Sequence, residues 1–401
     1  MSTLLAHAEV FDGHRMLPSG TEVLIEDGRI AAVGPKLPVP QDCEILDLTG
    51  HTLIPGMIDC HVHLVIDGLN PMKQLNDPFS LPYYVAADVL RRTLDLGITT
   101  VRDAGGADLG IKRAVELGLI EGPEVQIAVT VLSQTGGHTD GTTPCGLPNH
   151  LLPEHPGRPH PVVDGPEEMR KRVRELQRAG ADVIKICTSG GVSSITDDPR
   201  HPHFGMDELE ACVREARAGE TPVMAHAQGK PGIINAIRAG VRSVEHGVFA
   251  DEECFELLKA HDVWLVPTLT APVALNRMIA GGAPIPAEVV RKTELARIAH
   301  AEMIVEAVAA DVKIAMGTDS GVFPHGGNLE ELQLMREAGM TPEAVLHAAT
   351  ASAAELLELD DRGVLREGRR ADVVIVEGDA REFDRMAERI AGVYQAGRRV
   401  R

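Results

Sequence analysis

The sequence predicts an α/β protein in which a (β/α)8, TIM-like barrel is joined to a small β-sandwich domain formed by both ends of the chain. Three observations support this prediction. Short strand-like runs separated by turns occupy both ends of the chain, apolar β-branched runs alternate with helical patterns between them, and eight such runs occur in this central region. Eight strand–helix units are the number that closes a barrel of this kind.

The two ends of the chain have the same β-rich character. The first fifty residues alternate strand-like runs with turn signals such as Asp27-Gly28 and Thr49-Gly50. Residues 371–378 and 390–397 also resemble strands, without a crossover helix between them. Neither end has enough strands to bury a sheet face alone. We therefore expect residues 1–52 and 361–401 to form one β-domain beside a barrel of residues 53–360.

The central region contains the expected strands and helices in alternation. The strand-like runs are residues 52–55, 99–102, 124–129, 182–186, 222–225, 243–245, 263–266 and 313–316. Helical patterns fall at residues 82–96, 110–117, 166–179, 206–218, 230–239, 252–261 and 286–310, and then at 328–338, 341–349 and 351–359. Two insertions, residues 132–163 and 188–204, follow strands, so we expect them at the mouth of the barrel.

The amino-acid composition argues against some classes of binding partner. Hydrophobic residues make up 44% of the 401-residue chain, enough to bury a large core, and the net charge of −20 argues against a nucleic-acid or anionic membrane partner. The six cysteines form no C-x-x-C pair, and no apolar stretch approaches ~18 residues. The first residues lack the pattern of a secretory signal. We expect a cytoplasmic homo-oligomer that acts on a small molecule.

Two histidines one residue apart, His61 and His63, follow an apolar run at residues 53–58. If the run is a β-strand, both side chains point to the same side from its carboxyl end. Imidazole is the commonest ligand of zinc-like metals, so the pair could share one ion. Alone, the motif fits two buried polar residues equally well.

Further chemically capable residues stand at the ends of other predicted strands. Lys185 lies in the fourth, His226 ends the fifth, His246 ends the sixth and Asp319 follows the eighth. Each has a structural alternative, since a lysine can reach the surface, His-Gly can form a turn and Asp can cap a helix. Because the strand ends of one barrel meet at one face, their joint placement favours a shared site.

These stretches resemble the amidohydrolase superfamily of metal-dependent hydrolases, and the resemblance covers nearly the whole chain. The matching stretches are residues 55–63, 184–186, 224–226, 244–247 and 317–320. In members with this pattern, two divalent ions, usually zinc, are bridged by a hydroxide and by a lysine that CO2 has carboxylated. The resemblance implies a first ion held by His61, His63 and Asp319, a second held by His226 and His246, and Lys185 as the bridge.

The chemistry of Lys185 agrees with this implication. An ammonium group is a poor ligand that would repel two cations, whereas a carbamate offers two anionic oxygens. Metal binding also makes a hydroxide available near neutral pH, and Asp319 can take its proton and deliver it to the leaving nitrogen. We therefore expect two zinc ions per chain and carboxylation of Lys185.

Residues 133–140 resemble the branch that holds Xaa-Pro and other dipeptidases, arylamide and carbamate hydrolases and, more distantly, imidazolonepropionase. In that branch the histidine matching His138 contacts substrate and can polarise its carbonyl, although a ring that ties down a glycine-rich loop is the structural alternative. Dipeptidases of this type often carry a tyrosine two residues after the fifth-strand histidine, where this chain has Gln228. Gln228 can hydrogen-bond an amide or carbonyl but supplies no charge.

We predict a two-metal hydrolase that cleaves a C–N bond in an amide, dipeptide, N-acyl amino acid or carbamate by attack of the bridging hydroxide. Asp319 and His138 are the predicted catalytic residues, and His138 and Gln228 the predicted substrate contacts. A cyclic-amide hydrolase or deaminase with one metal, resembling imidazolonepropionase, is an alternative. A non-catalytic barrel that binds a ligand is a more remote one.

Overall fold

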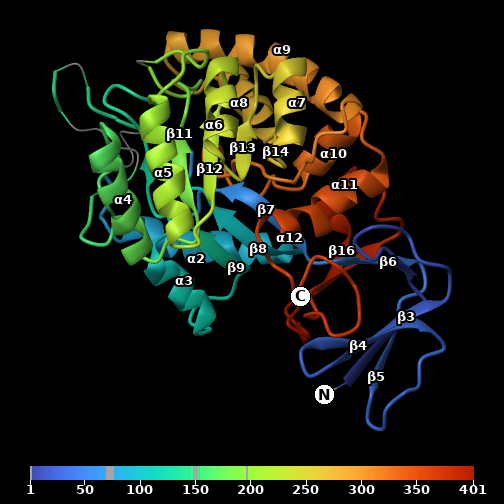
Figure 1. The fold of residues 1–401 in the computed structure, drawn as a ribbon. Helices are drawn as coiled ribbons and strands as arrows, with labels where there is room; N and C mark the ends of the chain where they lie inside the picture. Colours follow the sequence, from blue (N-terminus) through green and yellow to red (C-terminus); the bar gives the residue numbers. More distant parts are fainter. Residues whose placement is uncertain (1, 69–75, 144, 148–151, 153, 196) are drawn as a thin grey trace.

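The computed structural model describes residues 2–68, 76–143, 145–147, 152, 154–195 and 197–401 of the 401-residue chain. It is a mixed α/β structure in which helices surround parallel central strands (Figure 1). Within the 132–163 insertion, residues 144, 148–151 and 153 lie outside the described part, as does residue 196 in the second insertion.

Two parallel sheets occupy the centre of the molecule. The first contains β7 (Met57–Val62), β8 (Ile98–Asp103) and β9 (Glu124–Ile127). The second contains β10 (Val131–Leu132), β11 (Ile184–Cys187), β12 (Val223–Ala227), β13 (Ser243–His246) and β14 (Trp264–Val266). Most of these strands are buried along their whole length, which explains their continuous apolar runs.

The eighth predicted strand is irregular. Leu265 in β14 forms a parallel bridge with Ile314, and Val62 in β7 forms one with Ser320. The segment at residues 313–316 therefore lies between β14 and β7 without forming a regular strand.

The helices of the central region agree with the predicted ranges to within three residues at either end. They are α2 (Leu81–Asp95), α3 (Leu109–Glu116), α4 (Pro166–Arg178), α5 (Met206–Ala218), α6 (Lys230–Ala239), α7 (Glu252–Ala260), α9 (Ala287–Ala309), α10 (Glu330–Glu337), α11 (Pro342–Ala348) and α12 (Ala351–Leu356). Aspartates begin two of them: Asp108 accepts a hydrogen bond from the backbone N–H of Ile111, and Asp251 accepts one from that of Cys254.

One further helix, α8 (Thr270–Ala280), is absent from our sequence prediction. Pro272 stands at its third position, where a proline costs little because first-turn N–H groups have no partner within the helix. Glu331 in α10 accepts hydrogen bonds from the backbone N–H groups of Leu269 and Thr270, each at 2.8 Å. The capping group therefore comes from a distant part of the chain, which the local sequence does not reveal.

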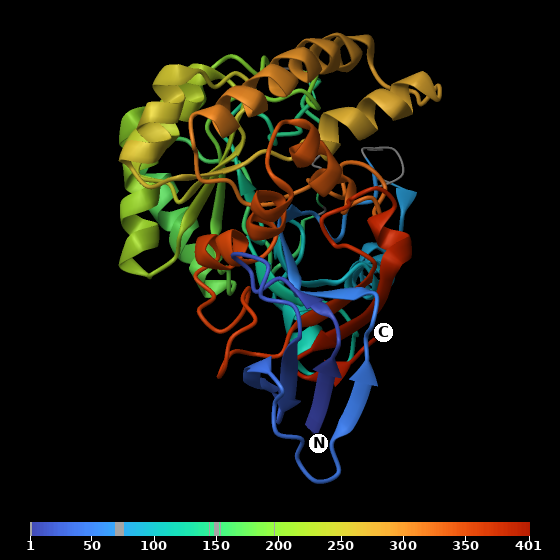
Figure 2. The same cartoon turned by 90° about the vertical axis from the view of Figure 1, so that its right-hand side faces the viewer.

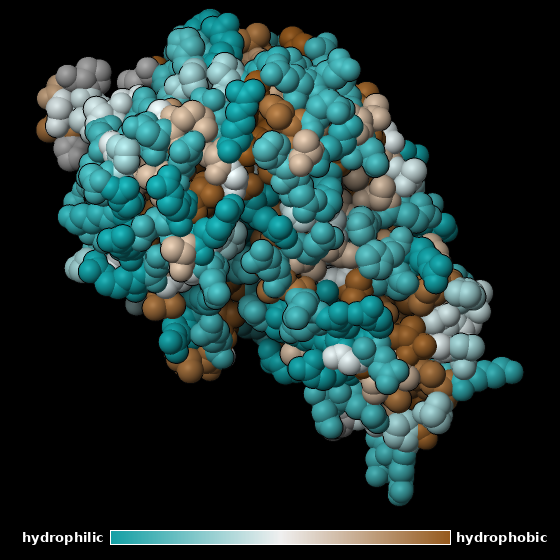
Figure 3. All heavy atoms as spheres, in the orientation of Figure 1, coloured by the Kyte–Doolittle hydropathy of each residue, from teal (hydrophilic) through white to brown (hydrophobic). Residues whose placement is uncertain are grey.

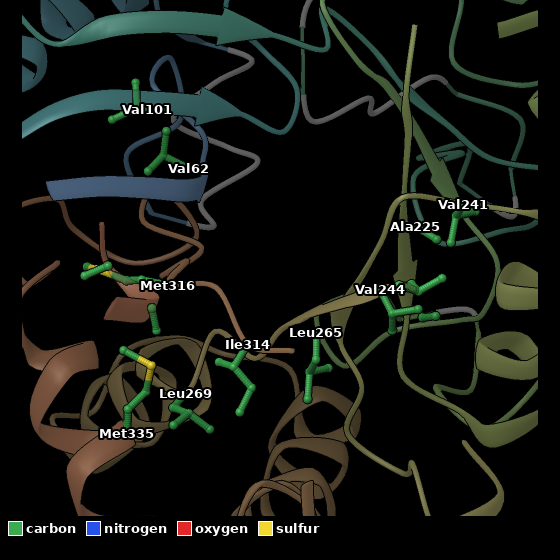
Figure 4. Close-up of a cluster of buried hydrophobic side chains, with 14 of the residues drawn as sticks. Val62, Val101, Ala225, Val241, Val244, Leu265, Leu269, Ile314, Met316 and Met335 are labelled. Atoms are coloured by element: carbon green, nitrogen blue, oxygen red, sulfur yellow. The ribbon is translucent and has the colours of Figure 1, made fainter. Parts of the chain in front are cut away.

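A large apolar core lies between the central strands and the helices. Figure 4 shows part of it, with side chains from β7, β8, β12, β13 and β14 and from the segment that precedes Asp319. The labelled members include Val62, Val101, Val244, Leu265 and Met316, which belong to one buried cluster. This packing fixes the strands whose carboxyl ends carry the predicted site residues.

Both ends of the chain form two additional sheets. One has the order β4 (Arg29–Pro35), β3 (Thr21–Glu26), β1 (Ser2–Ala6) and β5 (Glu44–Asp47). The other has the order β17 (Arg398–Arg399), β16 (Ile390–Gln395, preceded by a 3₁₀ turn at Met386–Arg389), β15 (Val373–Glu377), β6 (His51–Pro55) and β2 (Glu9–Val10). Figures 1 and 2 show these strands on one side of the helix-covered centre. Residues of both sheets share a buried cluster that includes Leu5, Val23, Leu53, Val373 and Ile375.

The apolar run at residues 52–55, which we counted as the first barrel strand, belongs instead to a terminal sheet. It forms most of β6, which pairs with β15 and β2, and the first central strand is β7. Gly56 separates the two strands, and a Cβ atom there would lie 2.2 Å from Oγ1 of Thr99. Because glycine has no Cβ atom, it is the residue that lets the backbone pass this close to the Thr99 side chain. The boundary that we placed at residue 53 therefore falls inside β6.

Polar side chains cover most of the face in Figure 3, and apolar atoms gather beside the terminal strands. Among the described residues, no helix combines the length and apolar character needed to span a membrane.

An ion-pair cluster connects the start of β9 to the C-terminal segment. The carboxylate of Glu124 lies 3.0 Å from Nη1 of Arg362 and also contacts Arg370. Burial raises the pKa of Glu124, but the charges and hydrogen bonds of the two arginines lower it overall, below its ordinary value. The ionised carboxylate therefore stabilises the folded state at neutral pH, and this contribution disappears as the pH falls through the lowered pKa.

We expect Glu124→Gln to lower the free energy of unfolding at pH 7 by about 1 kcal/mol, because the Glu124 side chain is 40% exposed and water screens the pair. The deficit should shrink below a pH of about 4.5, where the unfolded carboxyl begins to be protonated. Urea unfolding at several pH values measures this loss in the free energy of unfolding. Glu121→Gln, which removes an exposed partner of Arg398, is the matched control and should change stability by less than about 0.5 kcal/mol. A deficit that persists at acidic pH would contradict the assignment.

Candidate active site

One cavity of about 430 Å³ contains all the residues that the sequence analysis selected. The predicted metal ligands that line it are His61, His63, Lys185, His226, His246 and Asp319, and the predicted substrate contacts are His138 and Gln228. They come from the ends of different central strands and the loops that follow. The folded chain therefore gathers residues that are up to 258 positions apart, from His61 to Asp319.

The tightest group in the cavity contains His61, His63 and Asp319. Oδ1 of Asp319 lies 3.3 Å from Nε2 of His61 and 3.2 Å from Nε2 of His63. All three side chains are buried, and together they form a group that could hold a metal ion. Two imidazoles and one carboxylate suit zinc and similar divalent metals.

Backbone carbonyl groups determine which ring nitrogen two of the histidines present to the cavity. Nδ1 of His63 lies 2.7 Å from the carbonyl oxygen of Gly105, and Nε2 of His226 lies 3.1 Å from that of Gly190. A carbonyl oxygen only accepts hydrogen bonds, so these nitrogens carry the hydrogen. When either ring is neutral, its other nitrogen is therefore the one with a lone pair for a metal ion.

A buried carboxylate has the same role at His61. Oε2 of Glu245 accepts a hydrogen bond from Nδ1 of His61 at 2.7 Å, and Oε1 lies 3.1 Å from Nη2 of Arg102. Burial alone raises the pKa of Glu245, but the charge of Arg102 and the hydrogen bond from His61 lower it to about 2. Glu245 is therefore ionised and leaves Nε2 of His61 facing Asp319.

His246 is held by a side-chain hydroxyl. Its Nδ1 lies 2.7 Å from Oγ1 of Thr268, and its ring lies 5.1 Å from that of His61 and 4.6 Å from that of His226, centroid to centroid. Burial lowers the pKa of both His226 and His246 well below the ordinary histidine value. Both rings are therefore neutral, which is the form that binds a metal.

Lys185 reaches the same group from β11. Its Nζ lies 3.4 Å from Nε2 of His61, and the residue is almost fully buried. Among the described residues, no carboxylate oxygen forms an ion pair with it within 4 Å. Burial lowers the pKa of Lys185 below its ordinary value, since water no longer solvates the ammonium. The position suits a neutral amine or a modified side chain better than an ammonium ion.

Backbone conformation also singles out two of these positions. His246 and Asp319 have φ angles of +72° and +62°, in the left-handed region that non-glycine residues seldom adopt. The backbone N–H of Asp319 donates to the carbonyl oxygen of His61 at 2.8 Å. Such strain persists only where the surrounding structure enforces it, and it is concentrated at functional sites.

Two loops and two helices complete the cavity. The 132–163 insertion contributes Leu152, His155 and Arg158, and the 188–204 insertion contributes Val192 and Ser193, as the sequence analysis expected for loops at the mouth. The opposite wall comes from α8 and α9, with Ala271, Leu275 and Ala296 among its residues. The site is therefore open to an apolar group of moderate size.

His138 and Gln228 face this cavity in different ways. The ring of His138 stacks on that of His226, with centroids 4.3 Å apart and an interplanar angle of 15°. Oε1 of Gln228 is buried and has no hydrogen-bond partner among the described residues. An unsatisfied buried acceptor costs about 1–3 kcal/mol, so this amide oxygen is suited to receive a donor from a ligand.

The sequence analysis missed several residues that hold the site together. Glu245 stands directly before His246, and its position inside a buried strand was the available signal. Thr268, Asp197 and Lys292 had no such signal, because each acts on a histidine or loop from a distant part of the chain. Arg158 was also missed, although it lies in an insertion that we placed at the mouth.

Comparisons with known proteins find similar sequences and structures. The family model described as "Amidohydrolase family" matches residues 52–400. Ochratoxinase of Aspergillus niger is 35% identical over 372 residues, covering 88% of this chain and 77% of its own. A prolidase structure complexed with N-methylphosphonate-L-proline is 34% identical, with a TM-score of 0.91 and coverage of 100% of this chain and 99% of its own. A Xaa-Pro dipeptidase structure with bound methionine is 29% identical, with a TM-score of 0.89 and the same coverage.

We expect Glu245→Gln to weaken metal binding by ~10- to 100-fold, because it removes the charge that orients His61. Competition with a chromogenic chelator measures the affinity. Glu252→Gln, on the exposed first turn of α7, is the control and should bind metal normally. Equal affinity in the two variants would show that Glu245 does not support a ligand.

Proposed function

The chain belongs to the amidohydrolase family, and we propose that it is a two-metal hydrolase that cleaves the C–N bond of a linear amide. One observation carries the proposal. Each of four clustered imidazoles has one ring nitrogen engaged by an outer partner, which leaves the second nitrogen available beside Asp319 and Lys185. A histidine that binds a metal ion almost always has its other ring nitrogen hydrogen-bonded in this way, which fixes the orientation of the ring.

The residues present fit two divalent ions. His61, His63 and Asp319 would hold one ion, His226 and His246 would hold the other, and carboxylated Lys185 would contact both. When bound, the ions supply Lewis-acid activation of water and of the substrate carbonyl. We infer zinc as the metal from the imidazole-rich donor set.

The surroundings of Lys185 support its carboxylation. Its buried nitrogen lies 3.4 Å from a histidine nitrogen, where a positive charge has no carboxylate partner within 4 Å among the described residues. The neutral amine would add to CO2, forming an N–C bond and releasing one proton, and the product would carry one negative charge shared by two oxygens. This group can meet two cations that an ammonium would repel.

Two side chains would act on the substrate during hydrolysis. Asp319 would hold the proton taken from water at its carboxylate and pass it to the leaving nitrogen. Burial raises the pKa of Asp319, but the charges and hydrogen bonds of His61 and His63 lower it well below the ordinary value, so the carboxylate begins ionised. With a hydrogen on both ring nitrogens, His138 would donate from Nε2 to the carbonyl oxygen of the substrate and stabilise the charge that develops there.

The cavity suits an amide whose leaving group is an amino acid. Aliphatic residues such as Val192, Val248 and Leu275 line the wall, and Arg158, which donates to the carbonyl oxygen of Gly106 at 2.6 Å, adds a positive charge that attracts a carboxylate. Gln228 offers an acceptor for an amide N–H. The related prolidase structure with bound N-methylphosphonate-L-proline and the related Xaa-Pro dipeptidase structure with bound methionine support this class of substrate.

We also infer that the central region is a closed (β/α)8 barrel and that both termini complete one β-sandwich domain. The bridges Leu265–Ile314 and Val62–Ser320 support closure, and the shared cluster of the terminal sheets supports the single domain. We propose that the first boundary lies at Gly56, where the chain leaves β6. The barrel would then extend to about residue 360.

The direct test is a panel of N-acyl amino acids, dipeptides, aryl amides and carbamates, offered to zinc-loaded protein whose metal content is measured. We expect close to two zinc ions per chain, hydrolysis of an N-acyl amino acid or dipeptide, and loss of activity with a chelator. One ion per chain with activity on cyclic amides would favour the single-metal alternative. Binding without turnover across the panel would favour a non-catalytic role.

We expect Lys185→Ala to bind metal poorly and to be nearly inactive, because it lacks the anionic bridge. Acetate, propionate or bicarbonate at millimolar concentration should restore part of the activity by occupying the vacated space, whereas equal concentrations of chloride should not. Metal content and turnover are measured with each anion. A mass measurement that finds unmodified Lys185 in a fully loaded, active enzyme would contradict the prediction.

A further inference from the structure

A buried carboxylate outside the metal group holds His138. Nδ1 of His138 lies 3.2 Å from Oδ2 of Asp197, in the 188–204 insertion, and the Asp197 side chain is only 3% exposed. Because the ring also stacks on His226, two contacts restrict its tilt and its rotation. Nε2 of His138 lies 3.4 Å from Oγ of Ser193, and both residues line the cavity, so this edge of the ring faces the cavity while Nδ1 faces Asp197.

Asp197 is held in turn by Lys292 of α9. Nζ of Lys292 lies 2.9 Å from the carbonyl oxygen of Asp197, 2.7 Å from that of Ser194 and 2.9 Å from that of Gly191. It also lies 3.5 Å from Oδ1 of Asp197 and is itself 3% exposed. A buried ammonium needs several oxygen partners, and this one finds them all in a single loop.

The backbone of this loop packs directly against His138. A Cβ atom added to Gly191 would lie 2.1 Å from Cε1 of the His138 ring, so the loop can approach only because residue 191 is glycine. The N–H of Gly191 also donates to Oδ2 of Asp197 at 3.1 Å. The same carboxylate oxygen therefore joins the histidine to the loop.

We propose that Asp197, fixed by Lys292, is a positioning residue that aims His138 at the carbonyl oxygen of the substrate. The role rests on the proposed amide hydrolysis, in which His138 stabilises the developing charge. A carboxylate that engages one ring nitrogen fixes the direction of the other, and a displacement of about 1 Å can cost ~10²-fold in rate. Through Lys292, Asp197 is bonded to α9, the helix that also supplies part of the cavity wall.

Asp197 has the charge that the role needs. Burial raises its pKa, but the hydrogen bond from His138 and the charges of His138, Lys292 and His203 lower it overall. An ionised acceptor forms a stronger hydrogen bond than a neutral one.

A double-mutant cycle on the zinc-loaded full-length protein tests the proposal, with the panel amide that the unmodified protein hydrolyses fastest. We expect Asp197→Ala to lower kcat by ~10- to 100-fold with little change in KM, because His138 acts mainly in the transition state. His138→Asn should lower kcat/KM by ~10²-fold or more. The double variant should be within ~3-fold of His138→Asn, since Asp197 acts only through the ring.

Asp198→Asn is the matched control. This neighbouring carboxylate pairs with Arg200 at 2.7 Å and should leave kcat and zinc content unchanged. Asp197→Asn keeps a hydrogen-bond acceptor, so its kcat should fall between those of the unmodified protein and Asp197→Ala; it also replaces Asp197→Ala in the cycle if the alanine variant does not fold. A crystal structure of the Asp197 variant should show the His138 ring displaced from His226 while two zinc ions remain.

The outcomes separate the two proposals. Multiplicative losses in the double variant, or an unmoved His138 ring, would overturn the positioning role while leaving amide hydrolysis intact. Failure of the unmodified protein to hydrolyse any amide would overturn the proposed function, and the positioning role of Asp197 with it.

Discussion

The buried carboxylate of Asp59 holds together the two chain segments on which the site depends. It accepts hydrogen bonds from the backbone N–H groups of His61 and Thr318, each at 3.2 Å, from the Thr318 hydroxyl at 2.8 Å and from Asn328 at 2.9 Å. Burying a carboxylate is costly unless donors surround it, and here four donors do. The strand that carries His61 and the turn that carries Asp319 are therefore fixed to each other independently of a bound ion.

Hydrogen bonds between distant segments also hold the histidines of the site. Each imidazole has an oxygen partner behind it, supplied by a carbonyl, a carboxylate or a hydroxyl, and each partner belongs to a different strand or loop. These hydrogen bonds hold the rings in place, and donors that are held in place lose less entropy when a ligand binds. The strained backbone at His246 and Asp319 indicates that part of the folding free energy is used for this order.

Local patterns in the sequence predicted most of the fold, because strand and helix periodicities coincide with burial in the central region. They failed at residues 52–55, because the apolar residues continue from β6 into β7, which belongs to a different sheet. Only the close approach of Gly56 to Thr99 marks the boundary between the two strands. They also missed α8, whose first turn is capped by Glu331 from another helix. The histidines and Asp319 could be selected because strand ends converge, whereas the Lys292–Asp197 contact depends on tertiary packing that no local pattern encodes.

The pairing of β6 with β15 has a consequence for how the chain is made. β6 leaves the ribosome well before its antiparallel neighbour β15, which follows more than 300 residues later in the chain. During translation, that edge of β6 has no strand to pair with, and exposed edges are prone to association with other chains. The short length of β6, five residues, limits the size of this exposed edge.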